Sequence, residues 1–85
     1  MKQSQVVENI KSAVELLDEV IIDKNVPRNI RVVCEKTKDI LLGEGDEKIK
    51  IDAAIQNLDL LSDNLNVPTY TRMQIWNVVS LLESA

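Results

Sequence analysis

Residues 25–31 read NVPRNIR, and residues 66–72 repeat the phrase as NVPTYTR. Sliding the chain along itself by 41 positions aligns the two phrases and gives nine identical pairs between residues 10–41 and 51–82. A period near 40 residues with two helices in each unit is typical of helical-hairpin repeats. The sequence therefore predicts a single helical domain, residues 1–85, built from two similar hairpins that meet at a seam, residues 43–46. The identical pairs are Ile10/Ile51, Ala13/Ala54, Leu17/Leu58, Asp18/Asp59, Asn25/Asn66, Val26/Val67, Pro27/Pro68, Arg31/Arg72 and Leu41/Leu82.

Four segments carry apolar residues at the three-and-four spacing of a buried helical stripe. We expect helices at about 4–22, 27–42, 47–64 and 68–83, a reading that also suits a chain with 2% aromatic residues and two glycines. The fold class is all-α, and the predicted architecture is a four-helix antiparallel bundle. The alternative is a two-unit α-solenoid of the HEAT or armadillo kind.

Turn chemistry supports these boundaries. Pro27 and Pro68 each suit the first position of a helix, where no amide hydrogen is needed. Gly43 is expected to end the second helix in a left-handed turn, and Asp46 is expected to cap the third helix.

Two carboxylate–guanidinium pairs are predicted to brace the hairpins. Asp18 lies as far before the centre of its turn as Arg31 lies after it, and Asp59 and Arg72 are related in the same way. In an antiparallel hairpin, positions equidistant from the turn lie at the same level. Each aspartate is therefore expected to contact its arginine, and Pro27 and Pro68 complete this structural clasp.

The phrases VPRNIR at 26–31 and NVPTYTRMQIW at 66–76, with SLLE at 80–83, resemble a group of small archaeal proteins, the uncharacterised protein family 0147. The likeness extends from about residue 15 to residue 83. It implies a compact four-helix protein, and it implies no activity and no cofactor. Members of the family often carry His at the position of Tyr70 in this chain.

The composition argues against a catalytic or metal-binding site. The chain has no histidine, so the commonest general base and metal ligand is absent. Cys34 falls on an apolar stripe and is expected to be a buried thiol, and the single cysteine fits a reducing, cytoplasmic location. The carboxylates of the seam lack the alternating positions of a calcium loop and are read as a solvated linker: Glu44, Asp46, Glu47 and Asp52. We predict no catalytic, cofactor-binding or metal-binding residues, no membrane segment and no enzymatic activity.

The net charge of −4 lies entirely in residues 43–85, which argues against a dedicated nucleic-acid binder. Leu60, Met73 and Trp76 are apolar residues that the predicted core does not need. We expect them near the centre of a two-fold homodimer formed by the C-terminal hairpin, with an unknown protein partner as a further possibility. The leading hypothesis is a non-enzymatic protein-interaction or scaffold module. The alternative is a nucleic-acid-associated accessory protein that uses three basic residues of the second helix, Arg28, Lys36 and Lys38.

Overall fold

Four helices make up the described chain: α1 spans Lys2–Ile21, α2 Arg28–Leu42, α3 Glu47–Ser62 and α4 Thr69–Glu83. The computed structural model describes residues 2–62 and 67–84. The predicted bounds agree with these helices to within two residues. Three predicted positions lie outside the described residues: 63 and 64 of the third helix, and Asn66 of the repeated phrase. Both ends of α4 lie 41 residues after the corresponding ends of α2, which is the spacing of the sequence repeat.

Each proline of the repeated phrase stands one residue earlier than predicted, just before its helix. Pro27 has φ −54° and ψ 145°, and Pro68 has φ −57° and ψ 148°, so both are still extended. Their carbonyl oxygens accept the first helical hydrogen bonds, from Arg31 N at 3.2 Å and from Arg72 N at 2.9 Å. The φ of proline suits both positions, and only ψ distinguishes the cap from the first helical residue.

The connection between α2 and α3 differs from the prediction at its glycines. Gly43 is extended, with φ −73°, and the left-handed residue is Gly45, with φ 123°. The prediction that Asp46 caps α3 is confirmed, because its Oδ1 accepts hydrogen bonds from Lys48 N at 2.8 Å and Ile49 N at 3.3 Å. The turn therefore reverses at Gly45, where a residue with a Cβ would be strained.

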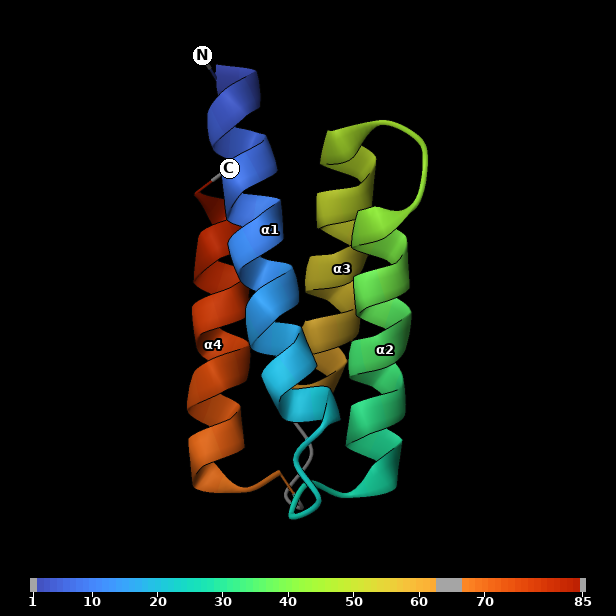
Figure 1. Ribbon diagram of the computed structural model, residues 1–85, viewed down its shortest axis with the longest axis vertical. Coiled ribbons are helices and arrows are strands. Elements are labelled where there is room, and N and C mark those ends of the chain that lie inside the picture. Colours follow the sequence, from blue (N-terminus) through green and yellow to red (C-terminus); the bar gives the residue numbers. More distant parts are fainter. Residues whose placement is uncertain (1, 63–66, 85) are drawn as a thin grey trace.

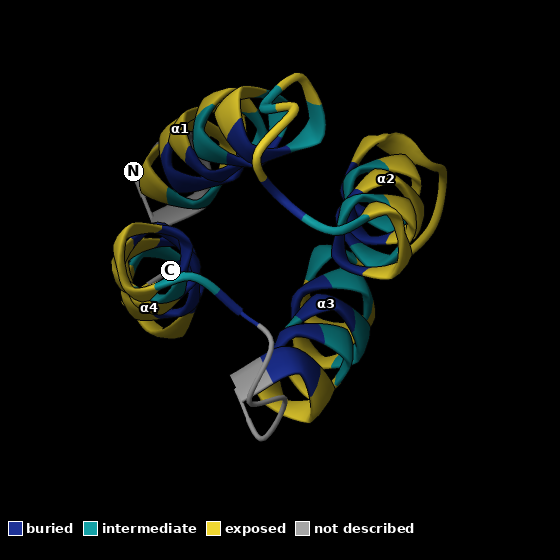
Figure 2. Ribbon diagram, turned by 90° about the horizontal axis from the view of Figure 1, so that it is seen from below, coloured by how far each residue is buried: buried dark blue, intermediate teal, exposed yellow. Residues whose placement is uncertain are grey.

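The four helices form a closed ring (Figures 1 and 2). Consecutive helices are antiparallel, and the start of α1 and the end of α4 lie at the same end of the molecule as the α2–α3 connection (Figure 1). The α1 and α3 helices each pack against both α2 and α4; the α1–α4 contact is the most extensive and the α3–α4 contact the least. Because α1 closes on α4, the molecule is a four-helix bundle of 38 × 21 × 20 Å, and the open solenoid is excluded.

The buried face of every helix points into the ring (Figure 2). The two halves bury equivalent positions, since each pair below is related by the same 41-residue shift and both members are less than 9% exposed. The duplication itself stays a prediction, which superposition of the two hairpins would test. These pairs are Ile10/Ile51, Ala13/Ala54, Leu17/Leu58, Val20/Leu61, Val26/Val67, Ile30/Thr71, Cys34/Ile75, Thr37/Val78 and Leu41/Leu82.

Candidate interaction surface

The ion pair that braces the first hairpin joins Asp18 to Lys38. Lys38 Nζ donates to Asp18 Oδ1 at 2.6 Å, and this hydrogen bond raises the pKa of the Lys38 ammonium above its ordinary value. The predicted Asp18–Arg31 contact is absent from the ion pairs of the described residues. Its premise of equal levels does not hold, because the connection 22–27 descends below the end of α1 before α2 begins (Figure 1). Asp18 therefore lies level with a later turn of α2.

Arg31 itself is half-buried, and in the described part of the chain its Nε finds no hydrogen-bond partner. The second predicted pair, Asp59 with Arg72, stays a prediction, because the connection 63–66 between their helices lies outside the described residues. Pro27 and Pro68, the other two members of the predicted clasp, each stand directly before a helix, at its N-cap.

Apolar residues of α4 stand at two positions whose equivalents on α2 are charged. Val79 occupies the position equivalent to Lys38, and Trp76 the position equivalent to Glu35. Trp76 and Val79 line a small hollow of about 20 Å³ at the α3–α4 junction, together with Leu58, Asp59 and Ile75. An indole ring therefore covers the junction that has the least extensive helix contact.

The three residues predicted to exceed the needs of the core are all exposed. Leu60 is 74% exposed, Met73 60% and Trp76 59%, and Tyr70 on α4 is 68% exposed. On α4 the three exposed residues follow one another every three positions, a spacing that keeps them on one side of the helix. We call these four residues the α3–α4 flank.

The flank is a broad surface, and its members do not form one tight cluster. Leu60 follows the fully buried Leu58 by two positions, about 200° around α3, so it points directly away from the core. Trp76 instead leans over the junction, beside Asp59. The structure therefore places Trp76 between the two helices and Leu60 on the outer edge of α3.

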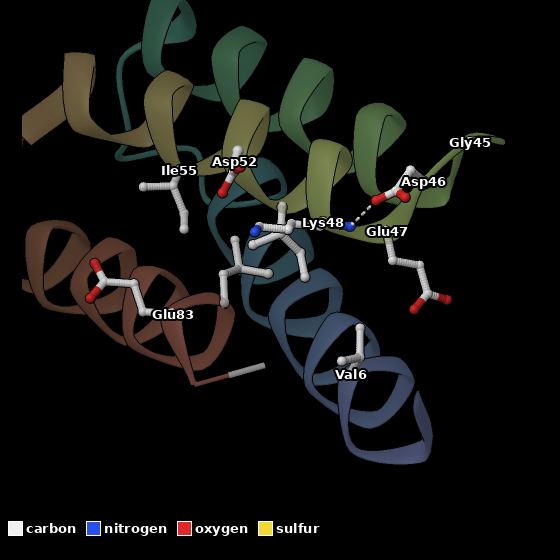
Figure 3. Close-up of a pocket in the computed structure, with 10 residues that line it drawn as sticks. Val6, Gly45, Asp46, Glu47, Lys48, Asp52, Ile55 and Glu83 are labelled. Atoms are coloured by element: carbon white, nitrogen blue, oxygen red, sulfur yellow. Dashed lines mark hydrogen bonds between the residues drawn. The ribbon is translucent and has the colours of Figure 1, made fainter. Parts of the chain in front are cut away.

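Reasoning from sequence missed a second concave surface at the end of the bundle that holds the chain termini. This open-end groove has a volume of about 890 Å³ and is lined by α1, the α2–α3 connection, the first half of α3 and the end of α4 (Figure 3). The available signal was the gathering of acidic residues at the seam, which the sequence analysis interpreted as a solvated linker. Only the fold shows that Glu83, at the other end of the C-terminal half, joins them.

Cys34 and the acidic side chains are the described groups that bear on nucleophilic chemistry and on metal binding. Cys34 is fully buried, and burial raises the pKa of its thiol to about 11, so the thiolate nucleophile is scarce at neutral pH. Within the described ranges, no group of three His, Cys, Asp or Glu side chains could hold a metal ion. No helix in those ranges is long and apolar enough to cross a membrane.

Comparison with known proteins assigns a family. The model of the uncharacterised protein family UPF0147 matches residues 1–85. A UPF0147 protein of Methanocaldococcus jannaschii is 49% identical over 77 residues, which are 89% of this chain and 83% of that protein. A UPF0147 protein of Archaeoglobus fulgidus is 33% identical over 95% of this chain and 93% of its own length.

Solved structures share the fold. The crystal structure of a protein of unknown function superposes with a TM-score of 0.89 at 38% identity, covering 93% of this chain and 91% of the other. A UPF0147 protein from Thermoplasma acidophilum also gives a TM-score of 0.89, at 27% identity over 95% of this chain and 96% of its own. The four-helix bundle is therefore the fold of these relatives too.

Proposed function

The chain belongs to the uncharacterised protein family UPF0147, and from that premise we propose that it is a non-enzymatic interaction module that pairs with a second copy of itself through the α3–α4 flank. The observation that carries the proposal is the position of Trp76, 59% exposed over the junction of α3 and α4. Tryptophan and methionine are enriched at the centres of interfaces, and a monomer gains no stability by leaving them exposed to solvent.

The distribution of exposed apolar residues supports this surface. Five of the nine large exposed apolar side chains among the described residues lie on α3 and α4, in the half of the chain that carries the acidic excess. Those five are Ile49, Leu60, Tyr70, Met73 and Trp76. Four of the five make up the flank, and three of these lie on one side of α4, whereas exposed apolar residues scattered singly need no explanation.

A second copy is the occupant that these residues fit best. Two-fold symmetry brings the same apolar side chains together from both copies, and it lets the carboxylates around them stay at the solvated rim. An ordinary interface buries about 800 Å² on each partner, which is about a seventh of the 5642 Å² surface of this chain. The area is thus available on one flank without covering the remainder of the bundle.

The nucleic-acid alternative has no specific observation in its favour. Lys38, one of its three basic residues, is held by Asp18 and faces another helix. Arg28 and Lys36 remain exposed on α2, with Glu35 between them. Retention on RNA or DNA that falls steeply as salt is raised would revive this alternative, because phosphate contacts release counterions.

Trp76 gives the proposal a direct spectroscopic test, since it is the only tryptophan in the chain. On dilution from tens of micromolar to nanomolar, its fluorescence should shift to the red and become more accessible to acrylamide as pairs dissociate. Leu42→Ala removes an equally exposed leucine (61%) from the end of α2 and serves as the matched control, which should leave the dilution curve unchanged. Quenching that is constant over the whole range would argue against a contact at Trp76.

A further inference from the structure

The floor of the open-end groove is apolar and continuous with the core. Leu82 is 1% exposed and Ile51 8%, while Val6 and Ile55 pack partly buried against them. An aliphatic side chain entering from outside would therefore extend an existing core, at about 25 cal/mol for each Å² of apolar surface removed from water.

Charged side chains surround this floor, and their balance is negative. Asp46, Glu47, Asp52 and Glu83 line the groove, and Lys48 is the only cation among the described residues that line it. Figure 3 shows Asp52 on α3 and Glu83 on α4, with apolar side chains between them. The C-terminal end of α4 adds partial negative charge, whereas the opposing N-terminus of α3 is already capped by Asp46.

We propose that this groove binds a basic amphipathic helix supplied by a partner protein. Such a helix carries aliphatic residues at i, i+3 or i+4, and i+7, which can rest on the apolar floor. Lysine or arginine residues beside that stripe lay their stems over apolar surface and place their charges at the rim, next to Asp52 and Glu83. The occupant is thus complementary to the groove in both charge and polarity.

A helix suits the groove better than a small molecule does. The volume of about 890 Å³ lies at the upper end of the range for small-ligand pockets, which enclose most of their ligand. Here the charged rim residues Asp52 and Glu83 are exposed, and the hollow opens to solvent. A surface of this kind offers an apolar floor and charge, but little enclosure.

The inference rests on the proposed function as an interaction module, yet it uses a different surface. Trp76 lies seven residues before Glu83 on α4, about 10 Å along the helix. A protein that proves monomeric but binds the peptide would end the dimer proposal and leave this one standing. A dimer that does not bind the peptide would end this proposal and leave the dimer proposal standing.

The test uses a synthetic probe, a fluorescein-labelled peptide of about 16 residues with leucine at the three anchor positions and lysine beside them. Anisotropy titration of the full chain should give saturable binding in the micromolar range at low salt. A peptide with glutamate in place of lysine, and a scrambled peptide of the original composition, should each bind at least tenfold more weakly, since one loses charge complementarity and the other loses the apolar stripe.

Two double variants with the same change in net charge locate the site. Asp52→Asn with Glu83→Gln removes two exposed carboxylates of the groove, and Glu35→Gln with Asp39→Asn removes two exposed carboxylates of α2. The first should weaken binding by about three- to tenfold, and the second by less than twofold. Amide chemical-shift changes on titration should centre on the start of α3 and the end of α4.

Three results would overturn the proposal. Equal losses from the two double variants would mean attraction to the net charge alone. Equal binding of the original and scrambled peptides would show that the helical apolar stripe does not contribute to binding. Saturable binding of spermidine without binding of the peptide would make the groove a site for small cations.

Discussion

Replacing the same core leucine in each half, Leu17→Ala and Leu58→Ala, tests the packing of the two hairpins against each other. Both side chains are 0% exposed, and the 41-residue shift relates them. Each change removes three carbon atoms, about 2.4 kcal/mol at ~0.8 kcal/mol for each buried methylene, and the cavity left behind adds to this. For a chain of 85 residues, whose free energy of unfolding is roughly 4–13 kcal/mol, the loss is large.

The structure also predicts an order between the two variants. Leu58 borders the small hollow at the α3–α4 junction, where helix contact is least extensive, so neighbouring side chains can relax into the space. Leu17 directly precedes Asp18, whose carboxylate pairs with Lys38 on α2. We therefore expect Leu17→Ala to lower the free energy of unfolding by about 3–4 kcal/mol, and Leu58→Ala by about 2–3 kcal/mol.

Urea denaturation followed by far-UV circular dichroism measures both values, at one protein concentration so that any self-association contributes equally. The control is Leu42→Ala, whose side chain is 61% exposed and whose loss should change the free energy by less than about 0.5 kcal/mol. A larger loss at Leu58 than at Leu17 would refute the reasoning about the junction. Losses below about 1 kcal/mol at both positions would refute the core itself.

The remaining predictions concern single polar groups. Because the pKa of Lys38 is raised, its pairing with Asp18 stabilises the fold fully below about pH 10.5, and this stabilisation is lost as pH rises through the folded-state pKa. Lys38→Met lacks the pair, so it should lose less stability above pH 10 than the wild type does. The urea midpoint measures this loss. The Cys34 thiol, with its pKa raised to about 11, should react with a disulfide reagent only after urea unfolds the chain, and rapid labelling of the native protein would show that it is accessible. Gln74 is 7% exposed with its Oε1 unpaired among the described residues, so Gln74→Leu should raise the free energy of unfolding by about 1 kcal/mol, whereas a lower value would show that the amide is satisfied.

The helices and the core register could be predicted from the sequence because both depend on local periodicity. Apolar residues at helical spacing fix which face of each helix is buried, and the 41-residue shift repeats that choice in the second half. Asp46 was correctly predicted as a cap because its hydrogen bonds reach only two and three residues along the chain.

The predictions that failed depend on how the chain turns in three dimensions. Whether Gly43 or Gly45 takes the left-handed conformation depends on the path of the whole connection between α2 and α3. A hydrogen bond from outside this connection, from Lys50 Nζ to Gly43 O at 3.0 Å, also acts on that path. The partner of Asp18 depends on the relative heights of α1 and α2, which the number of residues in a turn does not determine.

The interaction surfaces were only partly accessible from the sequence. A surplus of apolar residues on the C-terminal half correctly indicated that Leu60, Met73 and Trp76 are exposed. The open-end groove could not be predicted, because Val6 and Glu83 lie at opposite ends of the chain and meet only when the bundle closes.

Sedimentation equilibrium of the wild-type protein and of Trp76→Ala tests self-association through the α3–α4 flank most directly. The wild type should have an average mass approaching twice 9.6 kDa at tens of micromolar. Trp76→Ala should raise the dissociation constant about 30-fold, the equivalent of about 2 kcal/mol for a central aromatic anchor. A wild-type mass of 9.6 kDa across the whole concentration range, or a Trp76→Ala variant that dimerises as well as the wild type, would contradict the account.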